Sequence, residues 1–320
     1  MYKLLFIAFL LIFLSINSFA WDDVGHKISA YIAWQRMTPV ARDNVIRILR
    51  AAPEDSQIST FYMNYGVEPE EQRKREFFML IATWADIIRD RSFDTRYKKY
   101  HKSNWHYADT FWKQVDGKVE VLSGFEEGGQ AVNQLVESDK LIRNSSASDK
   151  DKAVAIAWIM HLLGDLHQPL HTSARVTDLE PKGDQGGNLF LLTPQGTPRE
   201  KQENLHWFWD SIVLRAIPPK KTDFCERDYI EPLAQKFMKA YPFSASQNKL
   251  KLGDYKGLQQ ETFAFNATNI FTPDLIRFQP PSEKYKKNAY KLAEQQLAMA
   301  GYRMGELFNT VFGQPPAAVK

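Results

Sequence analysis

One short apolar segment, residues 158–171, constrains the fold more than any other part of the chain. It reads Trp-Ile-Met-His-Leu-Leu-Gly-Asp-Leu-His-Gln-Pro-Leu-His. His161 and Asp165 are four residues apart, so on a helix they share one face. Pro169 should end or kink that helix, which places His171 just beyond the break. Imidazole and carboxylate groups that converge in this way favour a metal site, although a buried helix with hydrogen-bonded histidines is the alternative.

The composition and periodicity of the remaining chain predict a helical protein. Of its 320 residues 44% are hydrophobic, enough for a large core. Period-2 strand patterns are nearly absent, and no repeat or long linker divides the chain. We therefore expect an all-α, single-domain multi-helix bundle over residues 21–312, with at most a short β-hairpin, and a flexible tail at 313–320. Helices are expected at 26–36, 39–50, 69–89, 126–143, from 148 into the central segment, and at 204–217, 229–241, 258–271 and 283–312. Loops are expected at 93–109 and 177–198, the latter with a possible hairpin at 188–193.

The first 20 residues are typical of a secretory signal peptide. Lys3 is followed by the apolar run 4–16, and Ser18 and Ala20 are small residues where a signal peptidase requires them. The run is short for a membrane span, so we expect no stable span after cleavage, with an uncleaved anchor as the alternative. Cleavage after Ala20 would start the mature chain at Trp21, in a secreted or periplasmic protein.

Charge and cysteine content limit how the chain could bind a substrate and which residues could bind a metal. The net charge of +3 comes from 41 basic and 38 acidic residues, which is too even for nucleic-acid binding by bulk electrostatics. An anionic substrate must therefore be held locally, by metals or a few arginines. Cys225 is the single cysteine, so no intramolecular disulfide can form and a cysteine-ligated zinc site is disfavoured. Candidate ligands are His and Asp, and the lack of disulfides in an exported chain favours a bacterial source.

Four further His/Asp features accompany the central segment. Residues 206–210 repeat its His-xxx-Asp spacing, and His26 follows shortly after the expected new N-terminus. Residues 84–89, Trp-Ala-Asp-Ile-Ile-Arg, place a carboxylate and a guanidinium on nearly the same helix face. Residues 105–109 read Trp-His-Tyr-Ala-Asp. Recurrence of the same ligand types favours a shared site over isolated structural histidines.

In this order the motifs resemble those of the S1/P1 nuclease family. The resemblance covers Trp21 to Asp210 and includes the Gly-Gly-Asn at 186–188. It implies an almost wholly helical fold and a cleft that holds three zinc ions. By resemblance, the first zinc would be bound by Asp86, His106, His161 and Asp165, the second by His171, His206 and Asp210, and the third by the α-amine and carbonyl of Trp21 with His26 and a shared Asp165.

The resemblance also implies roles in catalysis and substrate binding. Asp86 and Asp165 would act through the zincs that activate a water, and Arg89 would neutralise charge on the phosphoryl group. Tyr107 would stack on a base and Asp109 would accept hydrogen bonds from its edge. Tyr107 stands where the family more often has Phe, and Asp22 where it commonly has Gly.

The expected function is an exported, zinc-dependent endonuclease. It would hydrolyse phosphodiester bonds of single-stranded DNA and RNA to 5′-phosphomononucleotides and act as a 3′-nucleotidase, with no protein partner implied. A zinc-dependent phospholipase C is the alternative, disfavoured because such enzymes usually carry Glu where this chain has Asp210. A non-catalytic zinc-binding surface protein is disfavoured by Arg89. His167 is expected to support the site rather than bind metal, and Asn188 is given no role.

Overall fold

The computed structural model of the chain describes residues 21–63, 69–125, 128–221 and 226–314. The expected signal peptide, Cys225 and the last six residues of the expected tail lie outside the described residues. The described part contains thirteen α-helices and four short β-strands, so the expected all-α class is confirmed. The helices are α1 (Asp23–Arg36), α2 (Pro39–Arg50), α3 (Glu70–Ile81), α4 (Trp84–Ile87), α5 (Asp94–Tyr100), α6 (Ala131–Arg143), α7 (Asp149–Asp165), α8 (Leu205–Asp210), α9 (Ile212–Ala216), α10 (Glu226–Ala240), α11 (Phe243–Ser246), α12 (Tyr255–Phe263) and α13 (Glu283–Phe312).

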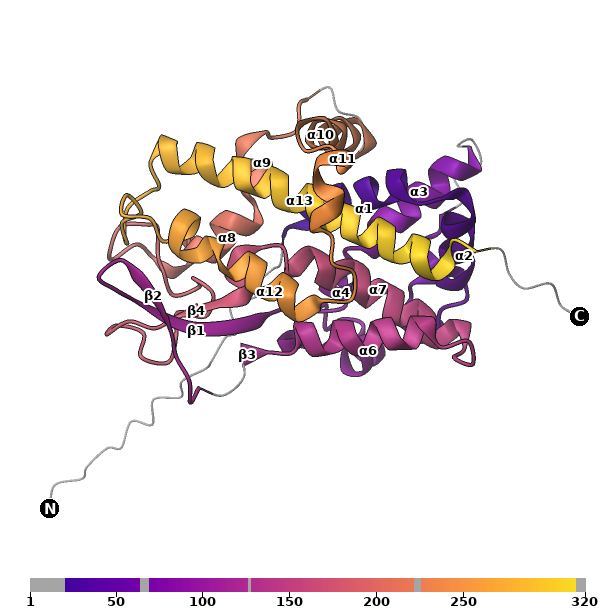
Figure 1. The fold of residues 1–320 in the computed structure, drawn as a ribbon, viewed down its shortest axis with the longest axis horizontal. Helices are drawn as coiled ribbons and strands as arrows, with labels where there is room; N and C mark the ends of the chain where they lie inside the picture. Colours follow the sequence, from indigo (N-terminus) through magenta and orange to yellow (C-terminus); the bar gives the residue numbers. More distant parts are fainter. Residues whose placement is uncertain (1–20, 64–68, 126–127, 222–225, 315–320) are drawn as a thin grey trace, which may run out of the picture.

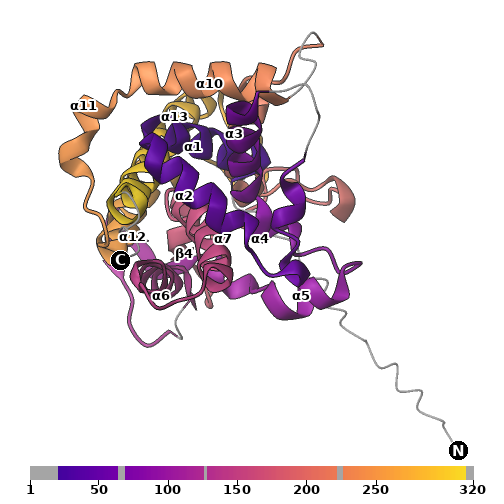
Figure 2. The ribbon, with the colours of Figure 1, turned by 90° about the vertical axis from the view of Figure 1, so that its right-hand side faces the viewer.

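The bundle is built on α1, α7 and α13. The long helix α13 runs through most of the molecule and packs against α1, α2, α7, α9 and α10 (Figure 1). Seen from the end, α10 crosses above this centre and α6 lies below it (Figure 2). No helix in the described ranges is long and apolar enough to cross a bilayer.

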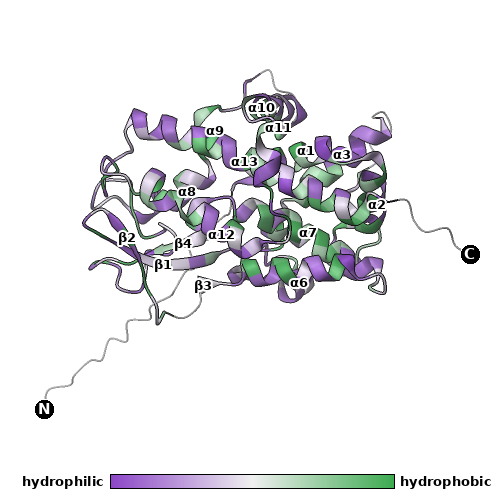
Figure 3. Ribbon diagram, viewed as in Figure 1, coloured by the Kyte–Doolittle hydropathy of each residue, from purple (hydrophilic) through white to green (hydrophobic). Residues whose placement is uncertain are grey.

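Helix α7 lies in the middle because it is apolar on nearly all sides. From Ala155 to Asp165 every residue of it is buried. A helix that is hydrophobic all round must be surrounded by other elements, whereas α6 buries only one stripe. Figure 3 shows this contrast, with α7 mostly green and α6 alternating between green and purple. The metal-ligand candidates of α7 are therefore buried by its position in the fold.

Three helices begin directly after residues whose side chains cap them. The side chains of Thr38, Ser148 and Ser282 each accept the backbone N–H of the residue three positions later. Such caps satisfy one of the donors that a helix N-terminus leaves open. The bounds of α2, α7 and α13 therefore agree closely with the sequence prediction.

Three expected helices are interrupted. The predicted helix 69–89 divides into α3 and α4, 204–217 into α8 and α9, and 258–271 into α12 and a π-helical turn at Asn266–Ile270. At the first break the carbonyl of Ala82 accepts a hydrogen bond from His161 instead of continuing the helix ladder. The expected loop 93–109 also contains α5, and α6 starts at Ala131 rather than 126.

The β-structure is small but lies elsewhere than the sequence suggested. Strands β1 (Ala108–Val115) and β2 (Lys118–Val121) form an antiparallel hairpin, with β3 (Gly128–Gly129) antiparallel and β4 (Ser173–Arg175) parallel to β1. The hairpin turns at Asp116-Gly117, whose φ angles of 50° and 77° suit this dipeptide. The segment 188–193 is a loop, apart from one bridge between Leu191 and Asn204.

Candidate metal centre

Side chains from several segments meet around the C-terminal end of α7. Helix α7 supplies His161 and Asp165, whose Nε2 and Oδ2 atoms lie 3.4 Å apart, as the spacing predicted. Helix α7 ends at Asp165, and the 3₁₀ turn η4 (Pro169–Thr172) then carries His171. The other contributors are His26 on α1, Asp86 on α4, His106 after the 3₁₀ turn η3 (Ser103–Trp105), and His206 and Asp210 on α8. All these side chains are buried except that of Asp86, which is half-buried.

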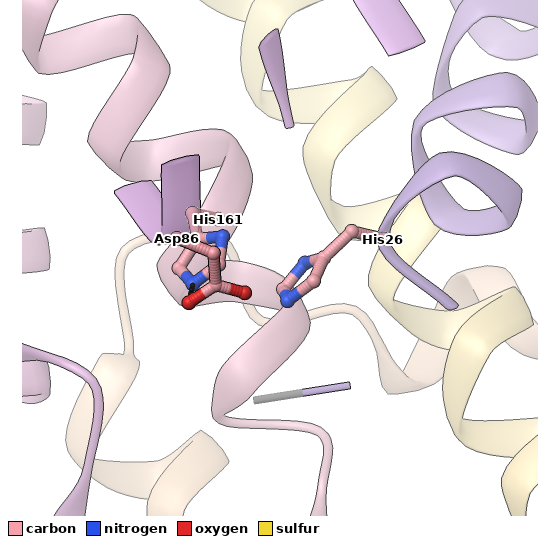
Figure 4. A group of neighbouring side chains, drawn as sticks. All are labelled: His26, Asp86 and His161. Atoms are coloured by element: carbon pink, nitrogen blue, oxygen red, sulfur yellow. Dashed lines mark ion pairs between the residues drawn. The ribbon is translucent and has the colours of Figure 1, made fainter. Parts of the chain in front are cut away.

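Asp165 lies at the centre of the larger cluster. Its Oδ2 is 3.2 Å from His106 Nδ1, and its Oδ1 is 3.4 Å from His26 Nε2. Asp86 Oδ1 lies 3.7 Å from His161 Nε2 and 4.0 Å from His106 Nδ1. Figure 4 shows His26, Asp86 and His161 pointing toward one another. Because the two oxygens of Asp165 face different histidines, this carboxylate is placed to bridge two ions.

His171, His206 and Asp210 form a second group. His206 Nε2 is 3.4 Å from Asp210 Oδ2, and His171 Nε2 is 3.7 Å from Asp210 Oδ1. One ligand atom from each of these residues can be chosen so that all three lie within 4.8 Å of one another. The structure thus brings together the three residues that the resemblance assigned to one zinc.

Hydrogen bonds fix the histidine tautomers in the form that binds metal. His161, His171 and His206 each place Nδ1 against a backbone carbonyl, which can only accept, so Nδ1 must carry the proton. Each Nε2 then presents a lone pair to the cluster, an arrangement typical of metal-binding histidines. The accepting carbonyls belong to Ala82, His106 and Gly186, at 2.8, 2.7 and 2.7 Å.

Burial favours the same protonation states. It lowers the pKa of His161 to about 4 and lowers the pKa values of His26 and His106 well below their usual range. These imidazoles are therefore neutral at pH 7. Burial, with the Asp86 carboxylate nearby, raises the pKa of Asp165 well above its usual range. Buried carboxylates close together need a compensating cation, so these residues fit metal ions.

Gln168 was missed by the sequence analysis. This fully buried residue donates from Nε2 to Asp210 Oδ1 at 2.7 Å, and its Oε1 accepts the N–H of Leu170 at 2.6 Å. It therefore orients a candidate ligand and stabilises the turn at Pro169. Its position next to the histidines was the available signal, but its partner lies 42 residues away in sequence.

His167 has both ring nitrogens occupied away from the clusters. Its Nδ1 donates to the carbonyl of Leu163 at 2.6 Å, and its Nε2 accepts from Arg303 Nη1 at 2.5 Å. Arg303 is itself buried and donates to Glu261 Oε2 at 2.6 Å. These contacts agree with the expected supporting role, and they attach the central segment to α13.

The residue expected at the mature N-terminus lies close to the site. Trp21 is fully buried, and the N–H of Asp22 donates to the carbonyl of Asp210 at 3.0 Å. Asp22 also caps α1, because its Oδ1 accepts the N–H of Gly25 at 3.1 Å. Trp21 is therefore held against α8, next to the His171, His206 and Asp210 group. Coordination by its α-amine stays a prediction.

The candidate substrate-binding residues extend from the same site. Arg89 Nη2 lies 2.9 Å from Asp86 Oδ1. Tyr107, half-buried, follows the candidate ligand His106 directly, and Asp109 pairs with Gly128 in the sheet. Burial and the nearby Asp184 carboxylate raise the pKa of Asp109 well above its usual range. Base recognition by Tyr107 and Asp109 stays a prediction.

Asn188 lies in the turn that follows Gly186 and Gly187. Its Nδ2 donates to the carbonyl of Gln185 at 2.8 Å, and its Oδ1 accepts from Asn204 Nδ2 at 3.4 Å. Asn204 caps α8, because its Oδ1 accepts the N–H of Trp207 at 2.7 Å. Asn188 therefore joins the turn to the start of the helix that carries His206, a link that the sequence analysis did not assign.

Gly186→Ala is expected to weaken both the fold and metal binding. Gly186 has φ +63°, and a Cβ there would lie 2.5 Å from the Leu170 carbonyl oxygen and 3.2 Å from His206 Nδ1. We expect a loss of about 3 kcal/mol in the free energy of unfolding, from left-handed strain and this clash together. Chemical denaturation and zinc analysis of the purified variant would measure the two effects.

Gly196→Ala is the matched control. Gly196 has φ +86°, but a Cβ added there would meet nothing within 4 Å, so only the backbone strain remains, about 1 kcal/mol. Zinc content should stay at the native level. Equal losses of zinc in the two variants would refute the idea that Gly186 holds His206 in place.

The fold and the site together define a helical protein with two adjoining groups of buried His and Asp side chains that could hold metal ions. A family model described as S1/P1 Nuclease matches residues 21–313. The chain belongs to the S1/P1 nuclease family, as the motifs indicated.

Curated relatives that match the chain at low identity are named as nucleases. Nuclease P1 of Penicillium citrinum is 22% identical over 202 residues, which span 62% of this chain and 59% of that protein. Nuclease S1 of Aspergillus oryzae is 22% identical over 308 residues, or 93% of this chain and 94% of that protein. Endonuclease 2 of Arabidopsis thaliana is 25% identical over 215 residues, covering 64% and 59%. The chain thus matches less than two thirds of the length of nuclease P1 but nearly all of nuclease S1.

Proposed function

We propose that the chain is an exported, zinc-dependent endonuclease. It would hydrolyse phosphodiester bonds of single-stranded DNA and RNA to 5′-phosphomononucleotides and remove phosphate from 3′-nucleotides. The observation that carries the proposal is the contact of the two Asp165 oxygens with separate buried histidines, beside the His171, His206 and Asp210 group. Family membership supports the nuclease class.

The proposed ligand sets divide the two groups among three zinc ions. Asp86, His106, His161 and Asp165 would hold one zinc, and His171, His206 and Asp210 a second. Trp21 and His26 would hold the third together with Asp165, since His26 Nε2 lies 3.4 Å from Asp165 Oδ1. His26 also lies near Asp86 and His161, so the first and third sites adjoin. When bound, zinc ions lower the pKa of water and offset negative charge on a phosphate.

The protein groups around this cluster hold the substrate in place. Arg89 is fixed by Asp86 at the edge of the site, where its guanidinium would bind a phosphoryl oxygen. Tyr107 and Asp109 would receive the base, Tyr107 by stacking and Asp109 by hydrogen bonding. Gln168 would keep Asp210 in the orientation that its ligand role requires.

Arg89→Ala is expected to reduce kcat/KM by about 30- to 1000-fold, which corresponds to ~2–4 kcal/mol of lost electrostatic stabilisation in the transition state. Zinc content should not change, because Asp86 keeps its other neighbours. Steady-state kinetics on a single-stranded oligonucleotide and zinc analysis would measure both. Arg91→Ala is the matched control, since Arg91 is exposed and packs over Tyr97. A similar loss of activity in both variants would contradict the assignment.

The experiment that tests the function compares substrates of different chemistry. Purified protein beginning at Trp21 would be offered single-stranded DNA, a 3′-mononucleotide and phosphatidylcholine, with zinc measured in parallel. Cleavage of the first two, with about three zincs per chain, is the expected result. Turnover of the lipid alone would move the assignment to a phospholipase C. Bound zinc without turnover of any substrate would leave a metal-binding protein.

A further inference from the structure

Strand β1 presents a row of side chains away from the core. Residues Ala108 and Trp112 are buried, and Trp112 donates to Ser173, so these two residues face inward. The odd positions, Asp109 and Phe111, lie on the other face. Tyr107 comes directly before the strand. The row thus continues from the proposed base pocket toward the hairpin.

Phe111 forms an aromatic pair with Phe125 at this face. Their ring centroids are 4.5 Å apart and their planes differ by only 10°. Neither ring belongs to the hydrophobic core or packs against it. Phe125 is 36% exposed, and Phe111 is half-buried. Two stacked phenyl rings outside the core, one of them open to solvent, contribute little to folding but offer a flat apolar surface.

The pair lies next to the proposed base pocket. Phe111 is one same-face step beyond Asp109, about 7 Å along the strand and farther from His106. A Cβ added at Gly183 would lie 3.2 Å from the Phe111 ring, so this glycine lies beside it. Gly183 is followed by Asp184, whose carboxylate raises the pKa of Asp109. Asp109 and Phe111 therefore lie near the same segment, residues 183–184. At the next odd position Lys113 pairs with Glu120 at 3.1 Å, so the aromatic surface ends there.

We propose that Phe111 and Phe125 form a stacking site for a second base of a single-stranded substrate, next to the pocket of Tyr107 and Asp109. This inference rests on the proposed nuclease function. Every base has a π-face, so such a site binds without sequence preference. It would make the enzyme favour chains of two or more nucleotides over mononucleotides. The second base belongs to the nucleotide on the side away from the metal cluster.

The test uses two substrates that differ only in that base. Both are dinucleotides with a 3′-terminal phosphate monoester and an uncleavable methylphosphonate linkage, and one lacks the base of its 5′ nucleotide. Release of inorganic phosphate by the zinc-loaded enzyme is measured. The base should raise kcat/KM by about tenfold in the native protein, in line with the strength of base stacking on an aromatic ring.

Variants at Phe125 separate stacking from folding. Phe125→Ala and Phe125→Leu should lose the gain from the second base, whereas Phe125→Trp should keep it. Turnover of a 3′-mononucleotide should not change in any of them. Val121→Ala is the control, because Val121 is 60% exposed on the same hairpin and lies outside the aromatic pair.

Three outcomes would overturn the inference. The base could fail to raise kcat/KM in the native protein, Phe125→Ala could keep the full gain, or Phe125→Ala could slow mononucleotide turnover to the same extent. In each case phosphate release from the mononucleotide would leave the proposed function standing. Absence of release from every substrate would instead overturn both the proposed function and the stacking site.

Discussion

Asp165→Asn is expected to lower kcat/KM by about a thousandfold or more, and to reduce the zinc bound per chain. The physical reason is the central position of this carboxylate. Its two oxygens face His106 and His26 at 3.2 and 3.4 Å, so one substitution disturbs two adjoining sites. An amide supplies one neutral oxygen where two negatively charged ones were available. Steady-state kinetics and metal analysis of the purified variant measure both effects.

The stability of the Asp165→Asn variant should depend on whether metal is present. Without metal, the substitution removes a fully buried carboxylate beside Asp86, so the melting temperature should be unchanged or higher. With zinc, the native protein should gain more stability than the variant, because binding to the folded state stabilises it. Thermal melts with and without zinc provide the comparison.

Asp139→Asn, a mostly buried residue paired with Arg143 on α6, is the control and should retain zinc and activity. Native zinc content in Asp165→Asn would disprove the bridging role.

Retaining Ala20 is expected to reduce activity by about a hundredfold or more and to remove one zinc. A peptide nitrogen has no lone pair available for a metal, whereas a free α-amine does. The location of Trp21 suits a metal ligand, because Trp21 is fully buried and Asp22 is hydrogen-bonded to the carbonyl of Asp210. Proteins starting at Ala20 and at Trp21 would be compared by zinc analysis and by cleavage of single-stranded DNA.

Recovery of activity after Ala20 is removed serves as the control for damage to the fold. Removing Ala20 from the longer protein with an aminopeptidase should recover zinc and activity together. Helix content measured by circular dichroism should be the same before and after removal. If the protein that retains Ala20 binds as much zinc and cleaves DNA as fast, the α-amine is not a ligand. That result would leave the His and Asp side chains as the complete set of ligands.

Much of the local structure follows from the sequence because its causes are local. Capping residues such as Thr38, Ser148 and Ser282 act within one helical turn, so helix starts were predictable. The i,i+4 spacing of His161 and Asp165 placed two candidate ligands on one face before any fold was known. The hairpin was also within reach, since Asp116-Gly117 is a strong turn signal. The sequence analysis overlooked it and placed a possible hairpin at 188–193.

Other features depend on contacts between distant segments, and the spacing of residues in the sequence does not reveal such contacts. The carbonyls of Ala82, His106 and Gly186 fix three histidine tautomers, and they come from segments 20 to 79 residues away. The partner of Gln168 and the helix break at Ala82 have the same origin.

The amino-acid sequence by itself determined the types and order of the candidate ligands and the helical class of this protein, because composition and periodicity act over a few residues. Only the tertiary structure decided which oxygen of Asp165 faces which histidine and that Phe111 lies against Phe125. These pairings depend on how α1, α7, β1 and the turn after α7 pack together, since burial and hydrogen bonding act between neighbours in space.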